Sequence, residues 1–231
     1  MNKPVSISAV VFDLDGTLLD TEDLSSRAIQ MSVGKFGKTF TWETKKKILG
    51  MRKACWAPIV IADLELEGQL SGEDLGREWE ENLHELTPLV KKCKGGASIT
   101  EFLERLRVPQ GIATSSSAAA VRVKRRNHED MFGRMQCIVT GDDPEVCEGK
   151  PAPDIYLVAA KRLGVDPRCC LAFEDAITGV QSAKGAGMFC VAVPDLRLDP
   201  DLFREAGADV VLLSLEEWDA RAWSFCTGGN G

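Results

Sequence analysis

The sequence contains few of the residues on which common metal and catalytic sites depend. Only two of its 231 residues are histidines, His84 and His128, which leaves almost no material for imidazole metal centres or histidine-based triads. The eight cysteines form no CxxC pair and show no regular spacing. Several of them, such as Cys137, Cys170 and Cys190, lie inside apolar runs, where a thiol behaves as a small hydrophobic side chain. We therefore expect reduced thiols and a cytoplasmic protein.

Excess positive charge and long apolar runs are also absent. A net charge of −7 and a pI near 5.0 argue against binding to nucleic acid or to an anionic membrane. The basic run at 123–126 is short, and we expect it to form a solvated helix face. No apolar run approaches the roughly 20 residues that cross a bilayer. The first apolar run leads into Asp13 and Asp15, which is not typical of a secretory signal. A monomer is the default expectation.

Short, continuous apolar runs recur along the chain and are separated by helical patterns. Continuous apolar runs are typical of strands buried on both faces, as in a parallel sheet. The expected strands are Ile7–Phe12, Gln110–Ala113, Cys137–Thr140, Cys170–Phe173, Phe189–Val193 and Asp209–Leu213. The expected helices between them are Ile99–Leu106, Ala118–Glu129, Asp154–Leu163 and Ile177–Ala186. This alternation predicts an α/β, doubly wound (Rossmann-like) parallel sheet.

The interval between the first two strands differs, because it contains no strand-like run. Four amphipathic helices are expected there: Glu22–Phe36, Glu43–Leu49, Ala57–Leu66 and Gly72–Leu86. A helical insertion at this point suggests a cap over the carboxyl edge of the sheet, where ligands of open α/β sheets bind. The expected domains are therefore residues 1–19 with 91–231 as the core and 20–90 as the inserted helical cap. The tail after Trp223 is expected to fray.

The segment Asp13-Leu14-Asp15-Gly16-Thr17 carries the strongest chemical signal. Two carboxylates directly after a buried strand are costly unless a cation offsets them. A calcium EF-hand places its glycine sixth and follows a helix, whereas this glycine is fourth and follows a strand. A plain turn at the end of the strand stays open from this segment alone.

Glu174 and Asp175 form a second acidic pair, after the fourth core strand. Asp175 alone would serve as a helix cap. Together with Asp13 and Asp15, however, the pair brings four carboxylates to the ends of two core strands. Oxygen-only ligands suit a hard cation, so we predict a magnesium site made by these four residues.

Two further segments suit a phosphate group. Thr114 and Ser115 follow a strand and precede a helix, where hydroxyls and backbone amides can bind phosphate oxygens. Lys150 lies between Gly149 and Pro151, and its ammonium would balance the charge of an acidic, phosphate-binding pocket. Alone, the first segment could be ordinary loop material and the second a solvated lysine.

In chain order, these motifs resemble those of the haloacid dehalogenase superfamily of phosphotransferases. DLDGT is similar to the first motif, Thr114 to the second, Lys150 to the third and Glu174-Asp175 to the fourth, and the helical interval resembles a C1-type cap. The resemblance covers residues 7–215. Three later segments, GDDPEVCEGKPAPDIYLVAAKRLG, CLAFEDAITGVQSAKGAGM and VAVPD, are similar to pseudouridine-5'-phosphatases. The chain resembles glycerol-phosphate phosphatases, sugar-phosphate phosphatases and beta-phosphoglucomutase less closely.

The resemblance implies hydrolysis of a small phosphomonoester in two steps. Asp13 would attack phosphorus to give an aspartyl-phosphate, and Asp15 would act as the acid and then the base. Magnesium would be held by Asp13, the Asp15 carbonyl and Asp175, with Glu174 nearby. The implied phosphate ligands are Thr114, Ser115 and Lys150, and the implied selectivity residues are Arg52 and Lys53. Pseudouridine-5'-phosphate is the expected substrate, and a phosphomutase or a non-catalytic binding module are the alternatives.

Overall fold

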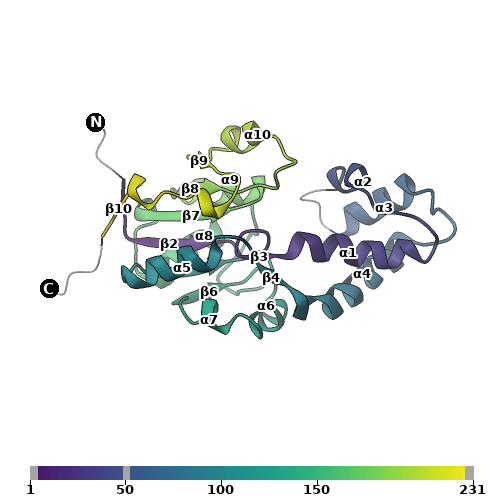
Figure 1. Cartoon of the computed structure of the whole chain (residues 1–231), viewed down its shortest axis with the longest axis horizontal. Coiled ribbons are helices and arrows are strands. Elements are labelled where there is room, and N and C mark those ends of the chain that lie inside the picture. Colours follow the sequence, from purple (N-terminus) through teal and green to yellow (C-terminus); the bar gives the residue numbers. More distant parts are fainter. Residues whose placement is uncertain (1–4, 49–52, 227–231) are drawn as a thin grey trace. The chain divides into compact units, whose positions relative to one another are not determined.

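The computed structural model describes residues 5–48 and 53–226 (Figure 1). The chain divides into two compact units, one made of Met1–Leu19 with Lys91–Gly231 and the other of Asp20–Val90. The first unit contains the predicted sheet, and the second is built from helices.

The core of the first unit is a six-stranded parallel sheet in the order β6-β5-β2-β7-β8-β9. Its strands are β2 (Ala9–Phe12), β5 (Gln110–Ala113), β6 (Cys137–Val139), β7 (Cys170–Glu174), β8 (Phe189–Ala192) and β9 (Val210–Val211). The chain builds one side of β2 first and then returns to build the other. Ligands of doubly wound sheets bind at this kind of switch point. The prediction of a doubly wound parallel sheet is confirmed.

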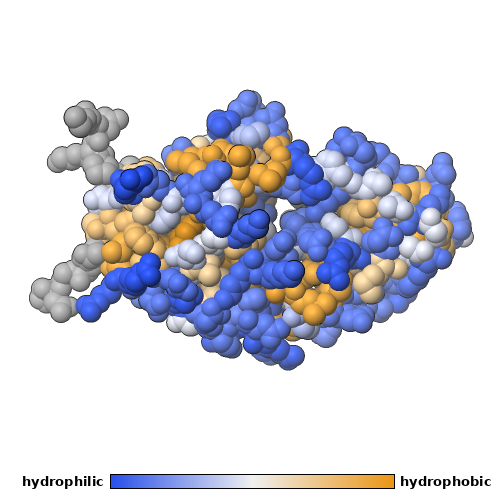
Figure 2. Space-filling view, viewed as in Figure 1, coloured by the Kyte–Doolittle hydropathy of each residue, from blue (hydrophilic) through white to orange (hydrophobic). Residues whose placement is uncertain are grey.

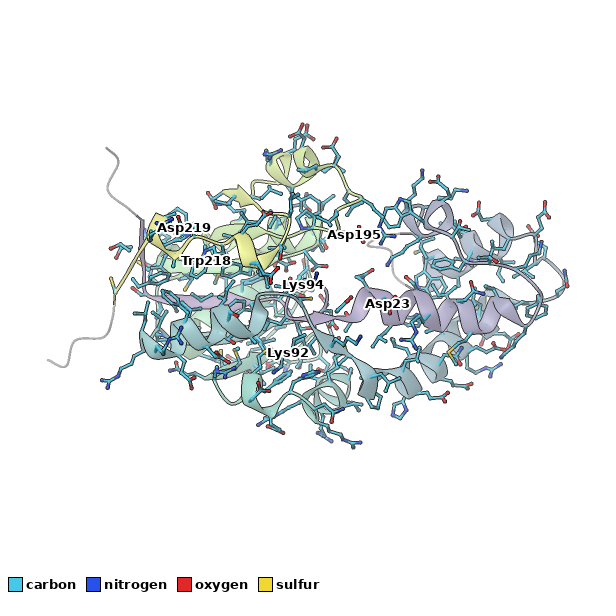
Figure 3. All side chains as sticks on the ribbon, viewed as in Figure 1. Asp23, Lys92, Lys94, Asp195, Trp218 and Asp219 are labelled. Atoms are coloured by element: carbon cyan, nitrogen blue, oxygen red, sulfur yellow. The ribbon has the colours of Figure 1, made fainter. Side chains whose placement is uncertain are left out.

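Both faces of this sheet are covered, which explains the continuous apolar runs. Side chains alternate between the faces along a strand. Ala9 and Val11 therefore belong to the core cluster under α8 and α9, whereas Phe12 points the other way and stacks on Phe173. Trp218, labelled in Figure 3, packs edge-on against Phe173, with 5.6 Å between the ring centroids. Strands at the centre of the sheet, such as β2, therefore pack apolar side chains on both faces.

Helices follow the strands of this unit, as the sequence predicts. They are α5 (Gly96–Arg105), α6 (Ala118–Arg125), α7 (Glu129–Phe132), α8 (Asp154–Leu163), α9 (Ile177–Gly185) and α10 (Pro200–Glu205), with 3-10 turns at Thr87–Leu89, Pro167–Cys169, Leu215–Glu217 and Ala220–Ala222. Helix α8 packs on β2, β5 and β6, and α9 packs on β7 and β8. The expected helix at 118–129 is divided into α6 and α7.

The ends of the chain differ from the prediction of a frayed tail. Strand β1 (Val5–Ile7) pairs in parallel with β10 (Trp223–Phe225). Cys226 N–H also donates to the carbonyl of Ile7 over 2.8 Å. The prediction is therefore wrong for residues 224–226. Two further strands that the sequence pattern did not suggest, β3 (Leu19–Asp20) and β4 (Lys91–Lys92), pair with each other.

The second unit contains four α-helices in its described residues. They are α1 (Thr21–Gly34), α2 (Trp42–Lys46), α3 (Lys53–Asp63) and α4 (Gly72–Leu86), close to the ranges that the amphipathic pattern indicates. Helix α4 packs against α1 and α3 around a core that includes Val33, Val60 and Leu75. The hydroxyl of Ser71 caps α4 by accepting the Asp74 N–H over 3.0 Å, as serine commonly does at helix starts.

The surface is largely hydrophilic in the view of Figure 2, with some hydrophobic areas. One of them lies beside α10 in this view. Leu196, Leu202 and Leu213 are among the exposed large hydrophobic residues. Among the helices that the structure describes, none is long and apolar enough to cross a membrane.

Candidate active site

Asp13 directly follows β2, and its carboxylate is nearly buried. Its backbone N–H donates to the carbonyl of Phe173 over 2.9 Å, which continues the β2–β7 pairing to the end of the strand. Its Oδ1 accepts a hydrogen bond from Lys150 Nζ over 2.5 Å. The side chains in this ion pair are only 8% and 6% exposed. A buried carboxylate needs such a partner, because an isolated charge is costly away from water.

Lys150 connects the ends of three adjacent strands. Besides Asp13, its ammonium donates to Glu174 Oε1 over 2.6 Å and to the carbonyl of Ala113 over 3.0 Å. It also lies 5.1 Å from the centre of the Tyr156 ring, a cation–π distance. All three donor protons of the ammonium therefore have acceptors, and the solvated lysine considered from sequence is excluded.

The loop that carries Lys150 is tied to helix α8. Asp154 Oδ2 accepts the backbone N–H groups of Cys147 and Glu148 over 3.1 and 3.0 Å. Farther along α8, Arg162 forms ion pairs with Asp143 and Glu145. These contacts tie the segment before Lys150 to the helix that follows it, so that the lysine reaches the strand ends from a defined position.

Glu174 is almost fully buried, and both of its oxygens have protein donors. Oε1 accepts the Tyr156 hydroxyl over 2.7 Å as well as Lys150. Oε2 accepts the backbone N–H of Asp175 over 3.1 Å. Gly179 makes room for this carboxylate, since a Cβ there would lie 2.0 Å from its atoms. Glu174 is thus held rigidly beside Lys150 and Asp13.

Asp175 completes an acidic cluster with Asp13 and Glu174. One oxygen from each of these three residues lies within 4.8 Å of the others. Gly16, with φ +87°, allows the first acidic loop to approach, because a Cβ there would lie 2.0 Å from Asp175 Oδ2. Three carboxylates and the Lys150 ammonium leave two negative charges, which fits a divalent cation bound through oxygen.

Burial and the neighbouring charges shift the pKa values of Asp13 and Lys150. The pKa of Asp13 is raised to about 7, mainly by burial and in part by the charges of Glu174 and Asp15, although Lys150 lowers it. Burial alone would lower the pKa of Lys150, but the carboxylates of Asp13 and Glu174 raise it above its ordinary value. Lys150 is therefore a stable cation, and a bound positive charge would favour the ionised form of Asp13.

The Asp15 carboxylate has different partners from Asp13. Oδ2 accepts the Ser116 hydroxyl over 2.7 Å and the Thr114 hydroxyl over 3.2 Å. Oδ1 forms an ion pair with Lys124 of α6. The acidic cluster found among the described residues does not include this carboxylate. The predicted role of the Asp15 carbonyl as a metal ligand stays a prediction.

The loop after β5 presents hydroxyls and amides at the same end of the sheet. Thr114 is buried, Ser115 is exposed, and Ser117 caps α6 by accepting the Ala120 N–H over 3.3 Å. Gly141 lies against this loop, where a Cβ would come within 2.4 Å of the Ser115 carbonyl oxygen. A helix start with a preceding hydroxyl loop is suited to an anion.

Most residues singled out from the sequence thus meet at one edge of the sheet. Each of them either lies at the end of a strand of the sheet or contacts a residue that does. They are Asp13, Asp15, Thr114, Ser115, Lys150, Glu174 and Asp175. Arg52 lies outside the described residues, and so does the side chain of Lys53.

Three contributors were missed from the sequence: Ser116, Lys124 and Tyr156. The sequence pattern predicts a solvated helix face for Lys124, but the residue is buried and contacts Asp15. Its spacing of three residues from the buried Val121 could have indicated an inward position. Tyr156, the only tyrosine in the chain, gave no signal in the sequence because a buried hydroxyl has no characteristic spacing.

Comparison with known proteins agrees with this geometry. A family model described as haloacid dehalogenase-like hydrolase matches residues 7–187. (DL)-glycerol-3-phosphatase 1, mitochondrial, from Arabidopsis thaliana is 39% identical over 221 residues, which cover 94% of this chain and 74% of that protein. A Drosophila melanogaster protein named "Probable pseudouridine-5'-phosphatase" is 38% identical over 215 residues, 92% of this chain and 91% of that one.

Among solved structures, CbbY from Rhodobacter sphaeroides in complex with xylulose-(1,5)bisphosphate superposes with a TM-score of 0.71. It is 28% identical in sequence, and the match covers 94% of this chain and 99% of that chain. These matches confirm the resemblance carried by the motifs. The chain belongs to the haloacid dehalogenase-like hydrolase family.

Proposed function

We propose that this protein hydrolyses small phosphomonoesters with the help of Mg²⁺ and through an aspartyl-phosphate on Asp13. One observation carries this proposal: the Asp13 carboxylate, paired with Lys150, lies beside the carboxylates of Glu174 and Asp175. A nucleophile, a fixed cation and a site for a second cation are what transfer of a phosphoryl group to a carboxylate requires.

In this mechanism, Asp13 forms the bond to phosphorus and Asp15 transfers the protons. Asp13 Oδ attacks phosphorus, the P–O bond to the leaving group breaks, and Asp15 gives that oxygen a proton. Asp15 then takes a proton from the water that attacks the aspartyl-phosphate, which frees phosphate and restores both acids. Lys150, Thr114 and the backbone amide of Ser115 stabilise the charge that develops on the phosphoryl oxygens.

The residues of the acidic cluster fit a magnesium ion. Asp13 and Asp175 would hold it, with Glu174 as the carboxylate that keeps Lys150 and Asp13 in position. When bound, the ion would neutralise charge on the phosphoryl group and on the attacking carboxylate.

Pseudouridine-5'-phosphate is the substrate that we propose first, with glycerol phosphates and sugar phosphates as the alternatives. The motif segments around Lys150 and Glu174 favour pseudouridine-5'-phosphate. The two relatives named above, which are similarly identical to this chain, support pseudouridine-5'-phosphate and glycerol phosphates equally. The helical unit Asp20–Val90 is proposed as a cap that selects among them. The free cysteines among the described residues support a reducing compartment such as the cytoplasm, and we propose a monomer.

A panel assay tests the proposal. Phosphate release from pseudouridine-5'-phosphate, UMP, glycerol phosphates and hexose phosphates is measured with Mg²⁺, for the wild type and for Asp13→Asn. Release by the wild type and not by the variant supports hydrolysis at Asp13, and the preferred ester identifies the substrate. Interconversion of sugar phosphates that depends on a bisphosphate, without net phosphate release, would replace hydrolysis with a phosphomutase reaction. Binding without either reaction would indicate a non-catalytic module.

A further inference from the structure

Lys124 occupies an unusual position for a lysine. It lies on the short helix α6, three residues after Val121, and these two are the buried residues of that helix. Residues three apart share one face of a helix, so Lys124 occupies an inward position that would ordinarily hold an apolar side chain. Its side chain is only 10% exposed. A buried ammonium is costly without partners, and its partners therefore indicate its role.

Among the described residues, the Lys124 ammonium contacts two side chains, and both belong to the candidate active site. It forms an ion pair with Asp15 Oδ1 and donates to the Ser116 hydroxyl over 2.8 Å. Ser116 in turn donates to Asp15 Oδ2 over 2.7 Å. The three side chains form a closed triangle, in which each one contacts the other two.

The triangle fixes the direction of the Asp15 carboxylate. Asp13 and Asp15 are two residues apart, yet Asp13 is paired with Lys150 and Asp15 with Lys124. Each of the two acids thus has a cation of its own, so they do not compete for one. Thr114 adds a further hydrogen bond on the same side as Ser116.

We infer that Lys124 is a positioning residue, which acts through Asp15 by holding its carboxylate, with Ser116, in the orientation needed for proton transfer. This inference rests on the proposed function, in which Asp15 is the acid and base. Lys124 need not touch the substrate in this role. Without it, Asp15 would keep its chemistry but lose its fixed orientation, and small displacements of a catalytic group reduce rates strongly.

A double-mutant cycle tests whether Lys124 acts through Asp15. We would measure kcat and KM for p-nitrophenyl phosphate with Mg²⁺ for the wild type, Lys124→Met, Asp15→Asn and the double variant. Lys124→Met is expected to lower kcat by about 10- to 100-fold with little change in KM. In the Asp15→Asn background, the same substitution should change kcat by less than about twofold.

Three comparisons make the result decisive. Arg125→Met, which removes a neighbouring exposed cation paired with Glu129, should leave kcat unchanged. Lys124→Arg, which keeps the charge, should recover part of the loss. Ser116→Ala should lower kcat in the same direction and also be non-additive with Asp15→Asn. If Lys124→Met does not fold, these last two variants carry the cycle instead.

Two kinetic outcomes would overturn the inference. One is an equal loss of kcat from Lys124→Met in both backgrounds, which would mean that Lys124 acts independently of Asp15. The other is no loss at all in the wild-type background. The same four proteins are also compared by thermal unfolding without substrate. The wild type could hydrolyse neither p-nitrophenyl phosphate nor any ester of the panel, while the unfolding temperatures of the four proteins are non-additive. That result would overturn both the proposed function and the catalytic role of Lys124, and would leave only the contact between Lys124 and Asp15.

Discussion

The ammonium of Lys150 lies 2.5 Å from Asp13 Oδ1 and thereby joins the loop 149–153 to the end of β2. The same ammonium contacts Glu174 at the end of β7 and the carbonyl of Ala113 at the end of β5. One side chain therefore orders three strand ends, and its loss should affect stability as well as activity.

Lys150→Met is expected to lower the free energy of unfolding by about 3 kcal/mol, because it leaves Asp13 and Glu174 buried without their cation. Urea unfolding of the apo-protein measures this loss. Lys161→Met is the matched control, since Lys161 pairs with Glu145 at the surface and its removal should cost no more than about 0.5 kcal/mol. Equal losses in the two variants would contradict the structural role of Lys150.

Gly179→Ala should disturb the acidic cluster, because its Cβ would lie 2.0 Å from the Glu174 carboxylate. We expect weaker binding of Mg²⁺ by isothermal titration and a kcat at least about tenfold lower. Gly185→Ala on the same helix is the control. Its Cβ would lie 3.5 Å from Pro153 Cβ, an ordinary contact, so alanine there should change stability by no more than about 1 kcal/mol. Similar behaviour of the two variants would refute the steric argument.

Removal of divalent metal should abolish phosphate release, and added Mg²⁺ should restore it. Because a ligand that binds only the folded state stabilises it, Mg²⁺ should also raise the melting temperature. Asp175→Asn should remove this increase. Asp219→Asn should keep it, since Asp219, labelled in Figure 3, pairs with Arg221 at the surface. An unchanged melting temperature of the wild type in Mg²⁺ would argue against the metal site.

Thiol alkylation should separate the cysteines by environment and by pH. Burial raises the pKa of Cys137 to about 11 and that of Cys170 to about 12, so at pH 8 only about one in a thousand Cys137 thiols is ionised. Since the thiolate reacts, labelling of Cys137 should increase about tenfold per pH unit below its pKa. Mass spectrometry of native protein at pH 8 should find iodoacetamide first on the exposed cysteines, which are Cys55, Cys147 and Cys226. Labelling of Cys170 as fast as Cys147 would contradict this burial.

The sheet was readable from the sequence because its strands are buried on both faces and therefore form uninterrupted apolar runs. Residues such as Val11 and Cys190 pack under helices, and Phe12 and Phe173 pack on the other face. The pairing of β10 with β1 was not readable, since three-residue strands at the two ends of a chain carry no periodic pattern.

The acids and Lys150 were also found from the sequence, because short motifs at strand ends bring them to one edge. The contact made by Lys124 was not found, since its spacing from Val121 can indicate an inward position but not the residue that it meets there. The role of Lys124 depends on the distance to Asp15, which lies 109 positions earlier in the chain. Contacts of this kind are visible only in three dimensions.

Trapping the phosphorylated enzyme tests the central claim most directly. The protein is mixed with Mg²⁺ and a phosphomonoester that the wild type hydrolyses, and the reaction is quenched within one turnover. The protein is then reduced with borohydride and digested for mass spectrometry. We predict a modified aspartate at Asp13 in the wild type and none in Asp13→Asn, with Asp15 unmodified in both. Phosphate release without any trapped modification at Asp13, or a modification on another residue, would contradict the account.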